Sequence, residues 1–384
     1  MRMIRHSILT LVFLGACAPN PAPQPAPQPA RQVERAETAP PAPRRVVLFI
    51  GDGVGVSYWT AARFASEQLN VEQFSVVGLV DTRSSSHRVT DSAAGATVYA
   101  TGVRTFNGAI GVGPDSLPLQ TVLELAEEKG MATGLVATSS ITHATPASFA
   151  AHVPSRRMES EIARHIAERE VDVILGGGRR FFDGTAEGAS NLLPELRERY
   201  TYVETAEELR ALDIDTVTTL LGLFAEGHMD RASAGRTPPL PEMTRTALEI
   251  LDRHPEGFFL MVEGSQPDWR GHANEPIEEV IAEMLDYDRA IGEALAYQAR
   301  NPETLVVVVA DHETGGLAIE EHDGELVAKY TTSGHTGQMI PLFAKGPGAD
   351  AFAGLIANYR VGELLREAVL GTAAPVKAAA STDD

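Results

Sequence analysis

The stretch Glu263-Gly-Ser-Gln-Pro-Asp-Trp-Arg-Gly-His272 holds the residues most suited to chemistry in this chain. It directly follows an apolar run at 258–262 that is typical of a buried strand. Asp268 and His272 are four residues apart, so one helical turn would place both side chains on the same face. A carboxylate at a strand end, followed by a carboxylate and an imidazole on one turn, is a suitable ligand set for a metal cluster, whereas such groups are costly in a core when unpaired. Taken alone, the stretch also fits a solvated loop.

Two further apolar runs end in residues of the same kind. The run at 46–50 is followed by Gly51-Asp-Gly53, and the run at 305–310 is followed by Asp311-His312. In doubly wound sheets, ligands bind outside the carboxyl ends of the strands. Three separate strands are therefore predicted to bring acidic or imidazole groups to one edge, with His335 in a loop nearby.

The elements that must position these residues alternate along the chain. Apolar runs typical of buried strands lie at 46–50, 76–80, 132–137, 171–175, 258–262 and 305–310. Amphipathic stretches typical of helices lie at 119–129, 159–169, 243–253 and 276–297. This alternation predicts an α/β fold with a mostly parallel central sheet covered by helices on both faces. The stretch 183–240 is less regular, and we expect a small insertion or lid there.

The N-terminus is typical of an export signal. Residues 1–6 are basic, residues 8–13 are apolar, and Leu14-Gly-Ala-Cys17 closes the segment in a way that resembles a bacterial lipobox. Cys17 would then carry a lipid; a plain secretory signal with an incidental cysteine is the alternative. Because Cys17 is the only cysteine, an internal disulfide and a cysteine-based zinc site are excluded.

These features predict the domain organisation. We expect a lipoprotein signal peptide at 1–16, the lipidated Cys17 with a Pro/Ala-rich linker to residue 43, a folded α/β body at 44–371 and a disordered tail at 372–384. The protein would be exported to the periplasm or the cell surface and tethered to a membrane only through its lipid. The formal net charge of −20 argues against nucleic acid as a specific partner, because phosphate backbones need basic surfaces. An anionic substrate would need a local positive site, which bound metal ions would provide.

A candidate nucleophile lies in the segment Thr90-Asp-Ser-Ala-Ala, which opens a predicted helix of small residues that ends at Gly102. At the helix N-terminus, Ser92 would face free backbone N–H groups and the positive end of the helix dipole, which favour an alkoxide and an incoming phosphate. The alternative is that Ser92 or Asp91 only caps the helix.

Five segments together resemble the alkaline phosphatase family and follow its order. They are Gly51-Asp-Gly53, the segment from Thr90 to Ala94, the stretch 263–272, Asp311-His-Glu-Thr-Gly-Gly316 and Ser333-Gly-His-Thr-Gly337. Each segment is a weak signal, but the combined set is highly specific, and the resemblance extends over nearly all of residues 45–370. It implies an α/β sandwich that hydrolyses phosphate monoesters with two Zn²⁺ ions and a third metal, usually Mg²⁺. It also implies a homodimer.

The resemblance also implies roles for individual residues. Ser92 matches the serine that becomes phosphorylated, and Arg156, held by Asp91, matches the arginine that clamps phosphate. The ligands of the first zinc would be Asp268, His272 and His335; those of the second zinc Asp52, Asp311 and His312; and those of the third metal Asp52, Thr145 and Glu263. His143 lies where some members have Asp, which leaves the third metal uncertain, and Trp269 lies where some have Lys. Six other histidines match no ligand position and are expected to be surface or packing residues: His87, His152, His165, His228, His254 and His322.

Two alternatives remain at the level of the sequence. A phosphodiesterase or sulfatase of the same superfamily would share the sheet and the zinc ligands. However, the sulfatase type needs a cysteine or serine in a motif that is absent here, and diesterases usually lack the third metal site and the clamping arginine. A non-catalytic, tethered phosphate- or metal-binding protein should have lost a ligand or the nucleophile, and here every matched position holds a competent residue.

Overall fold

The computed structural model describes residues 43–372. The predicted signal peptide, Cys17, almost all of the linker and almost all of the C-terminal tail lie outside the described residues. Within residues 43–372 there is no helix whose length and apolar character would let it cross a bilayer.

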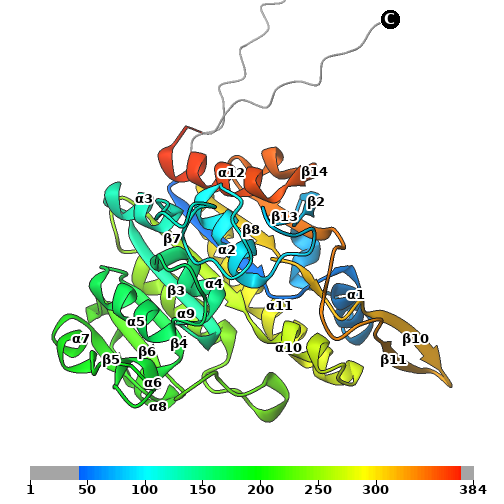
Figure 1. Cartoon of the computed structure of the whole chain (residues 1–384), viewed down its shortest axis with the longest axis horizontal. Helices are drawn as coiled ribbons and strands as arrows, with labels where there is room; N and C mark the ends of the chain where they lie inside the picture. Colours follow the sequence, from blue (N-terminus) through cyan, green and yellow to red (C-terminus); the bar gives the residue numbers. More distant parts are fainter. Residues whose placement is uncertain (1–42, 373–384) are drawn as a thin grey trace, which may run out of the picture. The chain divides into compact units, whose positions relative to one another are not determined.

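A central sheet of ten strands runs through the protein in the order β14-β2-β13-β8-β1-β7-β3-β4-β6-β5. The strands are β1 (Arg45–Gly51), β2 (Val76–Asp81), β3 (Ala132–Ser140), β4 (Val173–Gly177), β5 (Thr201–Val203), β6 (Leu220–Leu223), β7 (Phe258–Gly264), β8 (Thr304–Val309), β13 (Ile340–Lys345) and β14 (Gly354–Ala357). Among the ten described strands, only β13 runs antiparallel to its two neighbours, so the prediction of a mostly parallel sheet is confirmed. In Figure 1 the strands cross the body from β5 and β6 to β2 and β14.

Helices cover both faces of this sheet, as predicted. On one face α9 (Leu240–Leu251) and α11 (Ile277–Arg300) pack against the sheet, and α1 (Val56–Ala65) packs on α11. The other face is covered by α2 (Ser92–Thr101), α3 (Val122–Glu128), α4 (Ala144–Ala150) and α12 (Asn358–Leu370). The strands between them are continuous apolar runs; β7 and β8 are buried along their whole length, and β1 is buried from Val46 onward. Apolar side chains on both faces explain why these runs do not alternate with polar residues.

The remaining elements lie at the ends and edges of the sheet. They include α5 (Glu159–Glu168), α6 (Arg179–Phe182), α7 (Leu193–Arg199), α8 (Ala206–Ala211) and α10 (Gln266–His272). Two short antiparallel pairs are formed by β9 (Glu313–Thr314) with β12 (His335–Thr336) and by β10 (Ala318–His322) with β11 (Glu325–Lys329). Figure 1 shows β10 and β11 as a hairpin that projects beyond α1.

The stretch 183–240 is more regular than the sequence analysis expected. It contains α7 and α8, and its strands β5 and β6 extend the central sheet in parallel beyond β4. The short run Leu-Leu-Gly-Leu of β6 was not predicted as a strand, because glycine, threonine and charged residues surround it. At least this part of the stretch therefore belongs to the sheet, and a lid function for the rest stays a prediction.

A buried ion pair network ties the end of this stretch to α11. Arg236 donates to Glu283 at 2.7 Å and to Asp286 at 2.8 Å, and all three side chains are at most 6% exposed. Arg236 also donates to the carbonyl of Asp230 at 2.8 Å. Because two carboxylates share one guanidinium in a buried place, loss of the arginine would leave both without their main partner.

We therefore expect Arg236→Met to lower the free energy of unfolding by about 3–5 kcal/mol, the typical cost of breaking a buried ion pair from one side. Urea unfolding followed by circular dichroism would measure it. Arg245→Met is the matched control, because Arg245 pairs with Glu293 at 3.3 Å on the surface. That change should cost about 0–1 kcal/mol. Equal losses in the two variants would contradict the structural role of Arg236.

Candidate active site

The strand order places the acidic residues at one edge of the sheet, as the sequence analysis predicted. β1 lies between β8 and β7, and Ile50 of β1 is in register with Val309 of β8 and Glu263 of β7. Asp52 follows directly after β1. Asp311 comes two residues after β8 ends. Three carboxylates from three adjacent parallel strands therefore meet at the carboxyl edge.

Close backbone approaches at this edge require residues without a large side chain. Gly53 has a φ of +74°, and a Cβ there would lie 2.7 Å from the Cα of Asp268. A Cβ on Gly95 in α2 would lie 2.9 Å from the Cβ of Asp311. The small residues of α2 thus let the N-terminus of this helix approach the carboxylates.

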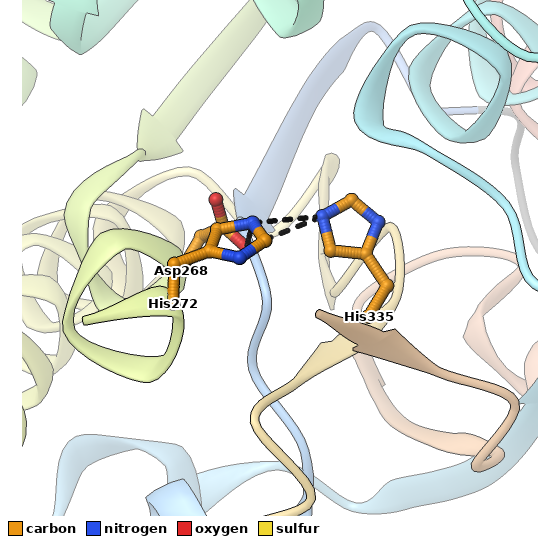
Figure 2. Close-up of side chains that lie close together, drawn as sticks. All are labelled: Asp268, His272 and His335. Carbon is orange, nitrogen blue, oxygen red and sulfur yellow. Dashed lines mark hydrogen bonds and ion pairs between the residues drawn. The ribbon is translucent and has the colours of Figure 1, made fainter. Parts of the chain in front are cut away.

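Asp268, His272 and His335 form the first cluster of possible metal ligands (Figure 2). Asp268 and His272 lie one turn apart on α10, as the spacing predicted, and His335 comes from β12. The Nε2 atoms of the two histidines are 3.1 Å apart. The Oδ1 atom of Asp268 lies 3.4 Å from His272 Nε2 and 3.7 Å from His335 Nε2. The side chain of His272 is 39% exposed, so this cluster is open to solvent.

Backbone carbonyls determine which ring nitrogen carries the proton in these two histidines. His272 Nδ1 lies 2.6 Å from the carbonyl oxygen of Ser333, and His335 Nδ1 lies 2.9 Å from that of Thr90. A carbonyl only accepts, so each Nδ1 donates and each neutral imidazole keeps its lone pair on Nε2. Two lone pairs and a carboxylate oxygen then converge on one point, and a cation there would satisfy all three.

Asp52, Asp311 and His312 form a second cluster in which all three side chains are fully buried. His312 Nε2 lies 3.2 Å from Asp311 Oδ2 and 3.5 Å from Asp52 Oδ1. The hydroxyl of Thr314 donates to Asp268 and therefore accepts from His312 Nδ1, which is 3.2 Å away. The lone pair of His312 Nε2 thus also faces carboxylates. The sequence analysis did not single out Thr314, which links the first cluster to the second.

Ser92 lies beside the second cluster at the N-terminus of α2. It is 2% exposed, and its Oγ is 3.3 Å from His312 Nε2. The preceding Asp91 is the N-cap, and its Oδ1 accepts from the backbone N–H of Ala94 at 3.1 Å. The cap position therefore belongs to Asp91, which leaves the Ser92 hydroxyl free to face the cluster.

A third cluster contains Asp52, Glu263 and His143. Ser139 donates to one carboxylate oxygen of Glu263 at 3.1 Å, while the other is buried without a hydrogen-bond partner in residues 43–372. Within the same part of the chain, both oxygens of Asp52 and the hydroxyl of Thr145 are also buried without a partner. Buried oxygens with no hydrogen-bond donor are rare in native proteins and fit a hard cation.

The electrostatics of the edge agree with this interpretation. Burial raises the pKa of Asp52 and of Asp311, and it raises the pKa of Glu263 to about 7. Burial also holds the pKa of His312 well below its usual range. Crowded, desolvated carboxylates beside neutral imidazoles are unfavourable by themselves and become favourable around divalent cations. The residues present therefore fit bound metal ions.

Arg156 supplies the positive side chain at this edge. Its backbone N–H donates to the carbonyl of Gly108 at 2.8 Å, and its Nη1 lies 3.3 Å from Asp91 Oδ2. Asp91 thus uses one oxygen to cap α2 and the other to hold Arg156. The capping role and the arginine-holding role that the sequence suggested for Asp91 are therefore compatible. Nη2 of Arg156 donates to Nε2 of His143 at 3.0 Å.

His228 is a second residue near the site, besides Thr314, for which the sequence predicted no role there. His228, in the loop after β6, was expected to be an ordinary surface or packing residue. It is exposed, but its ring centroid lies 4.6 Å from that of Trp269 and 5.4 Å from that of His143. No local pattern marks it, because it comes from the stretch whose strands were not recognised.

Comparison with known proteins agrees with this geometry. A family model described as alkaline phosphatase matches residues 43–331. The chain is 34% identical over 411 residues to alkaline phosphatase 3 of Bacillus subtilis (strain 168), covering 83% of this chain and 87% of that protein. The solved structure of alkaline phosphatase from the Antarctic bacterium TAB5 has a TM-score of 0.81 and 38% identity, covering 86% of this chain and 99% of that one.

A variant of the TAB5 enzyme is also similar. In it an aspartate replaces a histidine, and Mg is bound in the site called M3; its TM-score is 0.81 at 37% identity, covering 86% of this chain and 99% of that one. With a family model that spans most of its length and a relative of this similarity, the chain belongs to the alkaline phosphatase family.

Proposed function

We propose that this protein hydrolyses phosphate monoesters to inorganic phosphate and an alcohol through a phosphoserine formed on Ser92. Family membership makes the chain a metal-dependent phosphomonoesterase, and the proposal extends this to the residues that carry the reaction. The observation that carries it is the position of Ser92 Oγ, 3.3 Å from His312 Nε2 at the edge where three ligand clusters meet.

The residues of the first two clusters are suited to Zn²⁺. Imidazole nitrogens and carboxylate oxygens are ordinary zinc ligands, and the open first cluster has the character of a catalytic site. We assign one Zn²⁺ to Asp268, His272 and His335, and a second to Asp52, Asp311 and His312. Bound there, the two ions would lower the pKa of the serine hydroxyl and of water and stabilise the attacking and leaving oxygens.

The chain's own groups then carry out the displacement. Ser92 Oγ attacks phosphorus, the ester oxygen leaves as the alcohol, and water later cleaves the Ser92–phosphate bond to release inorganic phosphate. Arg156, held by Asp91 and by its backbone bond to Gly108, offers two N–H groups in a plane to two phosphoryl oxygens. The free N–H groups at the start of α2 add to this stabilisation.

The third cluster is proposed to bind Mg²⁺ through Asp52, Thr145 and Glu263. A neutral imidazole has a single lone pair, and that of His143 accepts from Arg156. His143 therefore serves to hold Arg156. The remaining ligand atoms of the third cluster are the oxygens of Asp52, Thr145 and Glu263, which suit a hard cation. Burial and the nearby Arg156 lower the pKa of His143, which keeps its ring neutral.

The location and the oligomeric state of the protein are also proposed. We propose export, lipid attachment at Cys17 with residues 17–43 as a spacer, and a homodimer, as the sequence analysis expected. Radiolabelled palmitate incorporation into the native protein but not into Cys17→Ser, and sedimentation of the purified body, would test these two points.

Replacement of the nucleophile gives the most direct test of the reaction. We expect Ser92→Ala to lower kcat for p-nitrophenyl phosphate by roughly 10³-fold or more and to abolish the ³²P-labelled phosphoenzyme that acid quenching traps. Ser160→Ala is the matched control, because among residues 43–372 the hydroxyl of Ser160 donates only to the carbonyl of Glu187. Turnover at the native rate in Ser92→Ala would refute the assignment of the nucleophile.

Metal removal tests the ligand clusters. EDTA dialysis is expected to abolish turnover, and Zn²⁺ together with Mg²⁺ to restore it, with the bound ions counted by atomic emission. His272→Ala should lose about one equivalent of zinc, because a missing imidazole weakens the site by roughly 10-fold or more. Full activity in a protein shown to be free of metal would exclude the mechanism.

The pH dependence of metal-linked stability has a definite sign. A carboxyl group whose pKa is raised by folding stabilises the folded state while protonated, so in the metal-free protein the contribution of Glu263 is lost as the pH rises through about 7. Bound cations remove the cost of keeping the buried Glu263 carboxylate ionised. Calorimetry should show the Tm difference between metal-loaded and metal-free protein growing from about pH 5 to pH 8. A constant or shrinking difference would contradict the prediction.

The affinity of the third cluster for Mg²⁺ is expected to depend on the residue at position 143. In the TAB5 enzyme, an aspartate for histidine variant has Mg bound in the M3 site. We expect His143→Asp to tighten Mg²⁺ binding by roughly tenfold or more, because an added carboxylate attracts a divalent ion. Mg²⁺ titration of zinc-loaded protein would measure it. His143→Ala removes the imidazole without adding charge; if it tightened binding equally, the carboxylate would not be the cause.

A further inference from the structure

Three aromatic rings lie together at the rim of the site, beside Arg156. The ring centroid of Trp269 is 4.6 Å from that of His228 and 6.0 Å from that of His143. The two imidazoles are 5.4 Å apart and nearly perpendicular, at 84°. We call His143, His228 and Trp269 the ring wall.

The members of the ring wall come from three different parts of the fold. His143 is the N-cap residue of α4, Trp269 is in α10, and His228 lies in the loop that follows β6. A hydrogen bond joins His228 to the sheet edge, since the backbone N–H of Ser140 at the end of β3 donates to its Nδ1 at 3.0 Å. This bond orients the imidazole toward the other two rings.

The ring wall touches the reaction machinery at two points. Trp269 directly follows Asp268 of the first cluster, and His143 accepts the hydrogen bond from Arg156. Trp269 is only half-buried, so the face of its indole needs neighbours to hold it in one rotamer. Of the two imidazoles that pack on it, that of His228 is the closer.

We propose that His228 is a positioning residue for the phosphomonoesterase reaction. Its ring holds Trp269 against His143, and through His143 it sets the position of the Arg156 guanidinium that binds the phosphoryl group. This inference rests on the proposed function. Contacts made equally to the bound ester and to the transition state change KM more than kcat, and the effect of His228 should follow that pattern.

Two substitutions separate the ring from its hydrogen bond. His228→Asn keeps an acceptor for the Ser140 N–H but removes the ring, whereas His228→Phe keeps a ring and removes the acceptor. We expect His228→Asn to raise KM for p-nitrophenyl phosphate and the inhibition constant of inorganic phosphate by about 2- to 10-fold, with kcat changed less. His228→Phe should stay close to the parent in all three quantities.

Fluorescence reports on the ring wall without any catalysis. The chain has two tryptophans, so a Trp59→Phe background leaves Trp269 as the single emitter. Trp59 lies in the core against Tyr287 and Phe343, where phenylalanine keeps an aromatic ring. In this background we expect His228→Asn to shift the emission to longer wavelength and to increase quenching by acrylamide, while His228→Phe does neither.

A double mutant and a surface control complete the test. His228→Asn combined with Trp269→Ala should raise KM no further than Trp269→Ala alone, because both changes disrupt one unit. His322→Asn is the control, since His322 is exposed and its ring pairs with Glu320 alone within the described part of the chain. The inference is overturned if His228→Asn alters only one of the two quantities, the Trp269 fluorescence or the KM, or alters neither. It is also overturned if His228→Phe has the same effects as His228→Asn. If the parent itself released no phosphate, the proposed function would fail, and the fluorescence would still report on the ring wall.

Discussion

The crowding of buried carboxylates at one edge of the sheet is the constraint on which the rest of this structure depends. Asp52, Asp311 and Glu263 come from three adjacent parallel strands and are fully buried. Like charges in a desolvated place strongly oppose one another. Within residues 43–372, both oxygens of Asp52 and one oxygen each of Asp311 and Glu263 have no hydrogen-bond donor, so hydrogen bonds stabilise these carboxylates only in part. Divalent cations resolve this conflict, so the same feature that weakens the metal-free fold prepares the site for metal ions.

The histidines are arranged to serve the same purpose. Three imidazoles each turn Nδ1 toward a carbonyl or hydroxyl, which keeps the Nε2 lone pair directed at the carboxylates. Thr314 contributes to two clusters at once, because it donates to Asp268 and accepts from His312. Outer partners of this kind set ring orientation and basicity, so the carbonyls of Ser333 and Thr90 fix how the rings of His272 and His335 present their lone pairs.

The side of the site that would receive phosphate is built differently. The buried carboxylates Asp52, Glu263 and Asp311 lie on or next to adjacent strands of the central sheet, whereas Arg156 and the ring wall come from loops and from the first turns of helices. Their positions depend on contacts with one another, from Asp91 to Arg156, from Arg156 to His143, and on to the rings. Variation there can alter substrate binding without disturbing the carboxylate cluster. The stretch 183–240 contacts this side of the site through the ring of His228, although its strands lie at the far end of the sheet order.

The sequence by itself determined the alternation of strands and helices, the acidic residues at the strand ends and the pairing of Asp268 with His272, because each follows from local periodicity. Together with the order of its motifs, it also indicated the family. Only the tertiary structure decided which groups meet. The lone pair of His335 is directed by a carbonyl 245 residues away, and His228 reaches the site because β6 joins the sheet. Hydrogen bonds and ring contacts between segments so distant depend on strand order and register, which are set by the packing of the whole sheet and leave no trace in local residue patterns.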